Sequence, residues 1–123
     1  MPYSFEITYP QKLIRIVAKN GFDTQHGMKA ITKSILHPDF DSDTRIIMDL
    51  REASLCIRAT ETPAIVKVIE KLKTCFENKV AIVFDAETQH IIGRRITEIA
   101  LKKRLELSAF ANTEKAEEWL GVK

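Results

Sequence analysis

Two short apolar segments constrain the fold of this chain more than any other feature. Residues 44–50 contain the run Ile46-Ile47-Met48, and residues 79–84 read KVAIVF. Strands that are apolar on both faces are typical of parallel sheets with helices packed against them. The residues between the two segments carry apolar side chains at helical spacing, from Ile65 to Phe76. A strand, a helix and a second strand in this order predict a right-handed crossover and a parallel strand pair.

The first twenty residues predict an antiparallel hairpin beside these strands. Residues 3–9 alternate between apolar and polar side chains, as a half-buried strand does. Residues 12–19 supply a second strand that is rich in apolar and β-branched side chains. Only Pro10-Gln11 separates the two, so we expect them to pair with each other through a tight connection.

Helical spacing and terminal signals predict four helices and one more strand. The helices are 23–37, with Met28, Ile31, Ile35 and Leu36 as its apolar positions, then 62–76, 87–103 and 112–120. Thr62-Pro63 and Asn112 are favourable helix starts. With a short strand over 105–110, the order is ββαβαβαβα. This order predicts one α/β domain over residues 1–123, with a mixed, mostly parallel five-stranded sheet, an N-terminal hairpin and four helices.

Composition argues against several classes of protein. The chain has 19 basic and 17 acidic residues among 123, a net charge of +2 that is too balanced for a dedicated nucleic-acid binder. No apolar stretch approaches the roughly 18 residues that span a bilayer, so we expect no integral membrane association. The N-terminal residues lack the pattern of a signal peptide. Cys56 and Cys75 match no zinc spacing, so we expect two free thiols and a cytoplasmic location.

The loops that follow the predicted parallel strands carry the candidate site residues. Asp49 and Arg51 follow one strand and Asp85 follows the next, at the sheet edge where α/β proteins usually bind ligands. Two neighbouring carboxylates can transfer protons or bind Mg²⁺. Aspartates at such turns more often cap helices or hydrogen-bond their own loop, and we favour that interpretation.

Other catalytic and cofactor-binding patterns are missing from the sequence. His26, His37 and His90 fall in different predicted elements without the spacing of metal ligands. There is no glycine-rich phosphate loop and no nucleophile motif. We therefore predict no metal, no cofactor and no catalytic residue. The basic residues at 94–95 and 102–104 are interpreted as a solvated helix face near the negative end of the helix dipole.

The C-terminal end is the most specific part of the sequence. Residues 110–120 have the form F-x-x-x-E-x-A-x-x-W-L, in which Ala116, Trp119 and Leu120 can hold a short helix against the sheet. This stretch resembles the end of STAS-like domains, the fold of the anti-sigma-factor antagonists, which is also grouped with SEC14-like proteins. The segment 46–50, which ends in Asp-Leu, and the segment 79–84 resemble the central strands of that family.

The resemblance implies a non-catalytic bacterial module that binds a protein partner or senses a ligand, with a regulatory role. In the regulatory antagonists, the helix after the Asp-Leu strand begins with a serine-rich motif that takes a phosphate. This chain has Ile57-Arg58-Ala59-Thr60 there instead, so it is more similar to the uncharacterised bacterial branch. Thr60 joins Asp49, Arg51 and Asp85 as a candidate contact with a ligand or partner.

Two alternative functions stay open at this point. The SEC14-like grouping suggests a protein that binds a lipid or a small apolar ligand, which requires a cavity of roughly 300 Å³ or more. A small enzyme that uses Asp49 and Asp85 requires close carboxylates with raised pKa values. A protein-interaction module instead requires an unbroken core and an exposed apolar patch.

The first predicted strand also suggests a homodimer. Residues 3–9 place Tyr3, Phe5, Ile7 and Tyr9 on one face, and the strand has no lysine or internal proline to protect a free sheet edge. Either a helix or a second copy of the chain must cover this aromatic face. We expect the second copy.

Overall fold

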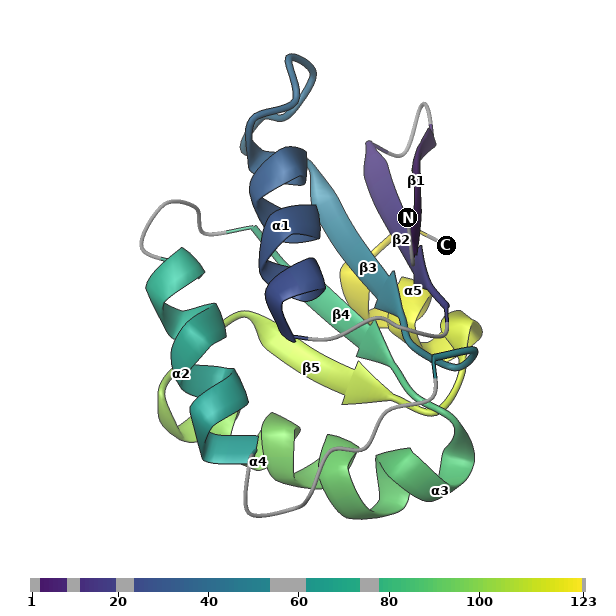
Figure 1. Cartoon of the computed structure of the whole chain (residues 1–123), viewed down its shortest axis with the longest axis vertical. Coiled ribbons are helices and arrows are strands. Elements are labelled where there is room, and N and C mark those ends of the chain that lie inside the picture. The colour runs from purple at the N-terminus through teal and green to yellow at the C-terminus, as the bar shows by residue number, and fades with distance from the viewer. Residues whose placement is uncertain (1–2, 9–11, 20–23, 54–61, 74–77, 123) are drawn as a thin grey trace.

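The computed structural model describes residues 3–8, 12–19, 24–53, 62–73 and 78–122, and its sheet has five strands (Figure 1). They are β1 (Tyr3–Thr8), β2 (Leu13–Ala18), β3 (Arg45–Asp49), β4 (Val80–Val83) and β5 (Leu107–Phe110). The strands lie side by side in chain order. β1 and β2 pair antiparallel, with Phe5 opposite Ile16, and all other neighbours pair parallel. The predicted mixed, mostly parallel sheet with an N-terminal hairpin is confirmed.

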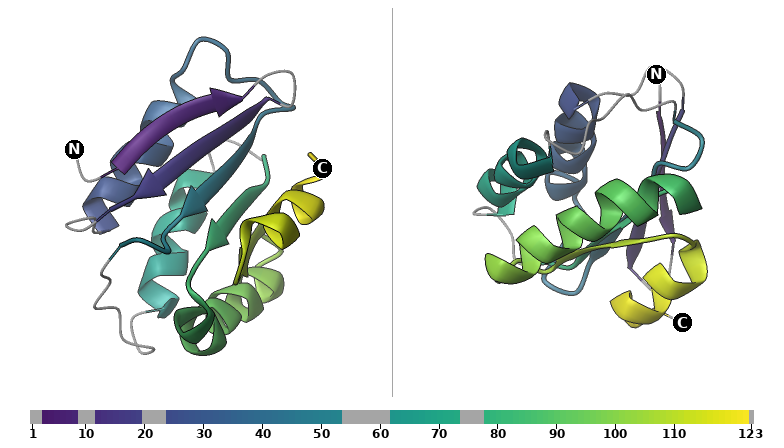
Figure 2. Two further views of the ribbon diagram at one scale, coloured as in Figure 1. Left: turned by 90° about the vertical axis from the view of Figure 1, so that its right-hand side faces the viewer. Right: turned by 90° about the horizontal axis from the view of Figure 1, so that it is seen from below.

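The helices form two unequal layers on this sheet. α1 (Thr24–Ile35), α2 (Thr62–Lys73) and α4 (Arg94–Lys102) cover one face, and α5 (Thr113–Leu120) covers the other (Figures 1 and 2). The predicted third helix is one run that begins with α3 (Ala86–Thr88), passes through a π-helical turn, η2 (Gln89–Gly93), and continues as α4. Asn112 caps α5 as predicted, since its side chain accepts a hydrogen bond from the Lys115 N–H at 2.9 Å.

The π-helical turn contains a contact that the sequence pattern did not reveal. The Gln89 side chain passes beside Gly93, and its Nε2 donates to the Ala109 carbonyl of β5 at 3.0 Å. A Cβ atom at position 93 would lie 1.8 Å from Gln89 Oε1. Glycine at this position therefore leaves the room that Gln89 needs to tie the helix to β5.

The core consists of two apolar layers, one on each face of the sheet. Ile46 and Met48 of β3 belong to the layer under α1, α2 and α4, whereas Ile47 belongs to the layer under α5. The strand is therefore buried on both sides, as its continuous apolar run predicts. On the α5 side, Leu120 is 1% exposed, whereas Trp119 is only partly buried and packs against Phe110 with ring centroids 5.7 Å apart.

Helix α1 covers the aromatic face of β1. Tyr3 is buried, and Phe5 and Ile7 pack against the same core layer as α1. The Phe5 ring stacks on His37 at a centroid distance of 6.2 Å, and Lys33 Nζ lies 5.3 Å from its centre. The sequence left two possible covers for this face, a helix of the same chain or a second copy of the chain. The structure shows the helix, α1, as the cover. Tyr9 lies outside the described residues.

Candidate functional site

Asp49 ends β3 on the α5 side of the sheet, and its carboxylate is bound within its own loop. The side chain is 8% exposed. It accepts hydrogen bonds from Arg51 Nε at 2.9 Å, from a terminal guanidinium nitrogen of Arg51 at 2.7 Å and from the Arg51 N–H at 3.1 Å. Burial opposes ionisation of Asp49, but these hydrogen bonds outweigh it and hold its pKa below the usual value.

Asp85 follows β4 and caps the third helical run. Its two carboxylate oxygens accept hydrogen bonds from the Thr88 N–H and the Thr88 hydroxyl, both at 2.9 Å. The backbone bond, followed by the hydroxyl bond, lowers the pKa of Asp85. The favoured sequence interpretation, helix capping and local hydrogen bonding, therefore describes what both carboxylates do.

We expect Asp85→Ala to lower the free energy of unfolding by about 1 kcal/mol, because the first turn of the helix loses its cap. Asp85→Asn should keep most of this stability, since an amide oxygen can still accept the Thr88 N–H. Urea unfolding followed by circular dichroism measures both values. Equal stability of the alanine variant and the wild type would contradict the capping role.

The hypothesis of proton transfer by two carboxylates receives no support from the strand-end residues. That hypothesis predicts raised pKa values, whereas the pKa values of Asp49 and Asp85 are both lowered. Over the described ranges, no group of three or more histidine, cysteine, aspartate or glutamate side chains is placed to hold a metal ion. Thr60 lies outside the described residues.

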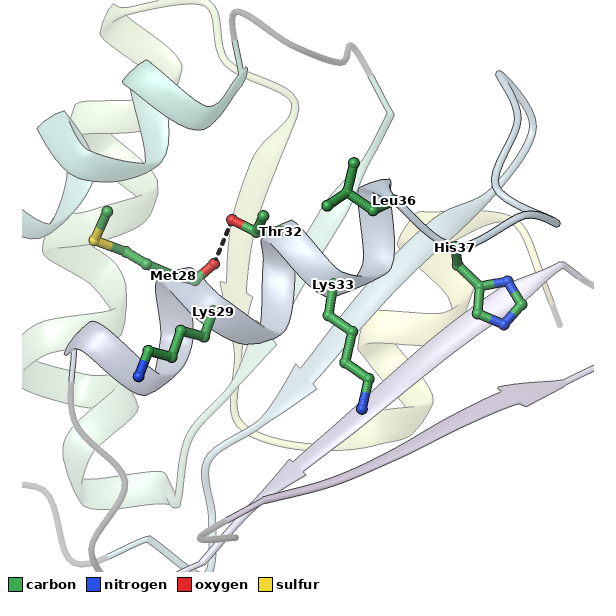
Figure 3. A pocket seen from close by; sticks show the side chains of 6 residues that line it. All are labelled: Met28, Lys29, Thr32, Lys33, Leu36 and His37. Carbon is green, nitrogen blue, oxygen red and sulfur yellow. Dashed lines mark hydrogen bonds between the residues drawn. The ribbon is translucent and has the colours of Figure 1, made fainter.

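A second candidate site lies on the outer side of α1 (Figure 3). It is a shallow depression of about 630 Å³ that is broadly open to solvent. Two rows of side chains line it, each with one residue per turn: an apolar row of Met28, Thr32 and Leu36, and a basic row of Lys29, Lys33 and His37. Figure 3 shows the two rows diverging from each other, because neighbouring residues on a helix are turned by about 100° around its axis.

Helical spacing in the sequence places Met28 and Leu36 among the apolar positions of this helix, together with Ile31 and Ile35. The structure corrects this assignment. Ile31 is 3% exposed and faces the core, whereas Met28 is 40% and Leu36 76% exposed. Met28 and Leu36 lie to the side of the buried stripe, because each residue along a helix is turned by about 100° from the last.

Lys29 and Lys33 form no ion pair with any residue in the described part of the chain. Some other basic side chains there are paired, as Arg15 is with Glu117 at 2.7 Å and Lys12 is with Asp41. The helix itself contains no acidic residue. The depression therefore combines exposed apolar surface with uncompensated positive charge.

None of the helices within the described ranges is long and apolar enough to cross a bilayer.

Comparison with known proteins bears on the fold. No family model matches the sequence, and no curated protein matches it. The structure is similar to the crystal structure of an uncharacterized protein of the DUF3478 family, with a SpoIIAA-like fold, from Shewanella loihica PV-4. The two share 18% sequence identity with a TM-score of 0.52 over 96% of this chain and 91% of that chain. The chain therefore has the SpoIIAA-like fold, which is the STAS-like fold that its C-terminal sequence predicted.

Proposed function

We propose that this protein is a non-catalytic, cytoplasmic STAS-like module with a regulatory role, and that it binds a protein partner through the exposed face of α1. The observation that carries this proposal is the apolar row of Met28 and Leu36 on the surface of a fold whose core is continuous on both sides of the sheet. Exposed apolar side chains that line a depression are typical of interaction sites.

The alternative of a small apolar ligand or lipid has weaker support. The depression exceeds the roughly 300 Å³ that such a ligand requires. However, sites of that kind bury most of the ligand surface, whereas this one is floored by a single helix and open to solvent. A protein partner needs no enclosure, because it brings its own surface to the contact.

The strand-end loops are proposed as secondary contacts. Arg51 is 44% exposed while Asp49 holds its guanidinium, so Arg51 is presented in a defined orientation. Asp85 is exposed at the next loop, and Thr60 completes the candidate set. Asp49 acts in this proposal only as the residue that positions Arg51.

Two variants with opposite expected results test the proposal. Leu36 and Leu101 are both 76% exposed, but Leu36 lines the depression, whereas Leu101 lies on α4. Affinity capture from native lysate with Leu36→Glu should lose a protein that the wild type and Leu101→Glu both retain. Circular dichroism confirms that both variants are folded. If all three proteins capture the same set, or if none captures a specific protein, the proposal is wrong.

We also propose a homodimer that forms through the outer edge of β1, which pairs with no further strand among the described residues. This strand lies at the edge of the sheet, and its sequence YSFEIT lacks lysine and proline. Because α1 covers the aromatic face, a second copy would pair with the strand edge and bury on the order of 1,200 Å² in total. Sedimentation velocity over a concentration series should show a dimer, and a monomer at the highest soluble concentration would contradict it.

A further inference from the structure

We infer that the partner segment bound by α1 is an acidic amphipathic helix. This inference rests on the proposed function and specifies the chemistry of the partner. It is carried by the arrangement of the apolar and basic rows, by the lack of an ion pair at Lys29 and Lys33 among the described residues and by the distribution of charge over the helices.

The two rows match the side-chain pattern of a second helix. Met28 and Leu36 are eight residues apart, which is about 12 Å along the axis at 1.5 Å per residue. Apolar side chains seven or eight positions apart on a partner helix span the same distance, and recognition of this type uses such anchors. Thr32 lies between them, where its hydroxyl donates to the Met28 carbonyl at 2.8 Å. Because the Thr32 side chain is short, the surface between Met28 and Leu36 leaves room for a side chain of the partner.

The basic row lies along only one side of this contact. Lys33 is held in place because its ammonium group lies over the Phe5 ring. His37 is less available, since its Nδ1 accepts from the Asp39 N–H at 3.1 Å and lies 3.8 Å from the Asp39 carboxylate. Acidic side chains of the partner are therefore expected opposite Lys29 and Lys33, beside its apolar row.

The charge of the surrounding helices favours the same partner. α1, α2 and the run from α3 to α4 together carry eight basic side chains, of which Lys73 is buried, and three acidic ones, whereas α5 on the opposite face carries one basic and three acidic. A face with an excess of positive charge speeds the approach of an acidic partner and orients it. A membrane with anionic lipids would also be attracted. However, a flat bilayer contacts a protruding apolar ridge better than the low centre of this depression, so the geometry favours a helix.

The test uses a synthetic probe, a fluorescein-labelled peptide of about five helical turns. The peptide has leucines seven residues apart and glutamates along one flank, and fluorescence anisotropy measures its binding. We expect binding by the wild type to weaken on the order of tenfold in Lys29→Glu/Lys33→Glu and to weaken further with added salt. Lys115→Glu, a single charge reversal at an exposed position of α5 on the opposite face, should bind as the wild type does.

Exchanging the charges of the peptide and the protein tests whether binding depends on their opposite charge. A second peptide with lysine in place of every glutamate should bind Lys29→Glu/Lys33→Glu better than it binds the wild type. A scrambled acidic peptide, whose leucines lie on all sides, should not bind. Equal binding of the scrambled peptide, or no effect of the double reversal, would overturn the inference. It would also be overturned if the wild type bound phosphatidylglycerol vesicles through these lysines and ignored the peptide.

Failure of this inference differs from failure of the proposed function. If Leu36→Glu loses its captured protein but the double lysine reversal keeps it, α1 binds a partner of another chemistry and the acidic helix is wrong. If neither variant changes what is captured, the site itself is wrong.

Discussion

Leu120→Ala is expected to lower the free energy of unfolding by about 2 to 5 kcal/mol, the range for removing a fully buried leucine side chain. Leu120 is 1% exposed and lies in the apolar layer between α5 and the sheet, together with Ile47 and Val83. Among the described residues, α5 is the helix that covers this face, so the loss of Leu120 directly removes part of its contact with the sheet (Figure 2). Urea unfolding monitored by circular dichroism measures the loss.

Trp119→Ala gives the matched comparison, because it removes a larger side chain from the neighbouring position. Trp119 lies at the margin of the same layer, with Lys79 Nζ 5.0 Å from its ring. We expect Trp119→Ala to lower the free energy of unfolding by less, for each side-chain atom removed, than Leu120→Ala does, because Trp119 is only partly buried. A Leu120 variant as stable as the wild type would mean that α5 contributes no core packing.

The parts of the fold that sequence predicted are those set by local patterns. The run Ile46-Ile47-Met48 leaves no polar face, so the strand must be covered on both sides. Asn112 and the residues after it form a helix start that needs no distant partner. In both cases the secondary structure is set by residues that are close together in the sequence. It can therefore be predicted from the local pattern.

The α1 site could not be predicted in this way. An apolar residue type does not reveal whether its side chain faces the core or the solvent. Met28 and Leu36 match helical spacing almost as well as Ile31 and Ile35 do. Their exposure follows from where α1 sits on the sheet. The Gln89–Gly93 contact likewise depends on β5, since Gln89 reaches a carbonyl twenty residues away in the chain. Such tertiary contacts override or supplement local periodicity.

For Asp49, the sequence predicted the position and the general role of the side chain but not its partner. Its place at the end of β3 was predicted, and so was a local hydrogen-bonding role for aspartates at such turns. The sequence did not reveal that Arg51, only two residues away, would bind both carboxylate oxygens. The bidentate geometry requires the chain to turn back immediately after the strand, and the Arg51 N–H bond to Asp49 marks that turn.

Asp49→Asn is expected to lower the free energy of unfolding at pH 7 by about 1 to 3 kcal/mol, because hydrogen bonds to a charged, largely buried carboxylate are lost or weakened. The pKa of Asp49 in the folded protein lies below its unfolded value of about 3.9. The stabilisation by the carboxylate is therefore complete above the unfolded pKa and is lost as the pH falls through the folded pKa.

The difference between wild type and Asp49→Asn should consequently be largest near neutral pH and should shrink below about pH 4, where the unfolded carboxyl takes up its proton. Urea unfolding at several pH values between about 7 and 2.5 measures this convergence. Glu118→Gln removes the same charge from an exposed position of α5 and serves as the control for the loss of one carboxylate. If the difference between wild type and Asp49→Asn does not shrink as the pH falls, the charged form of the Asp49 carboxylate adds nothing to folding.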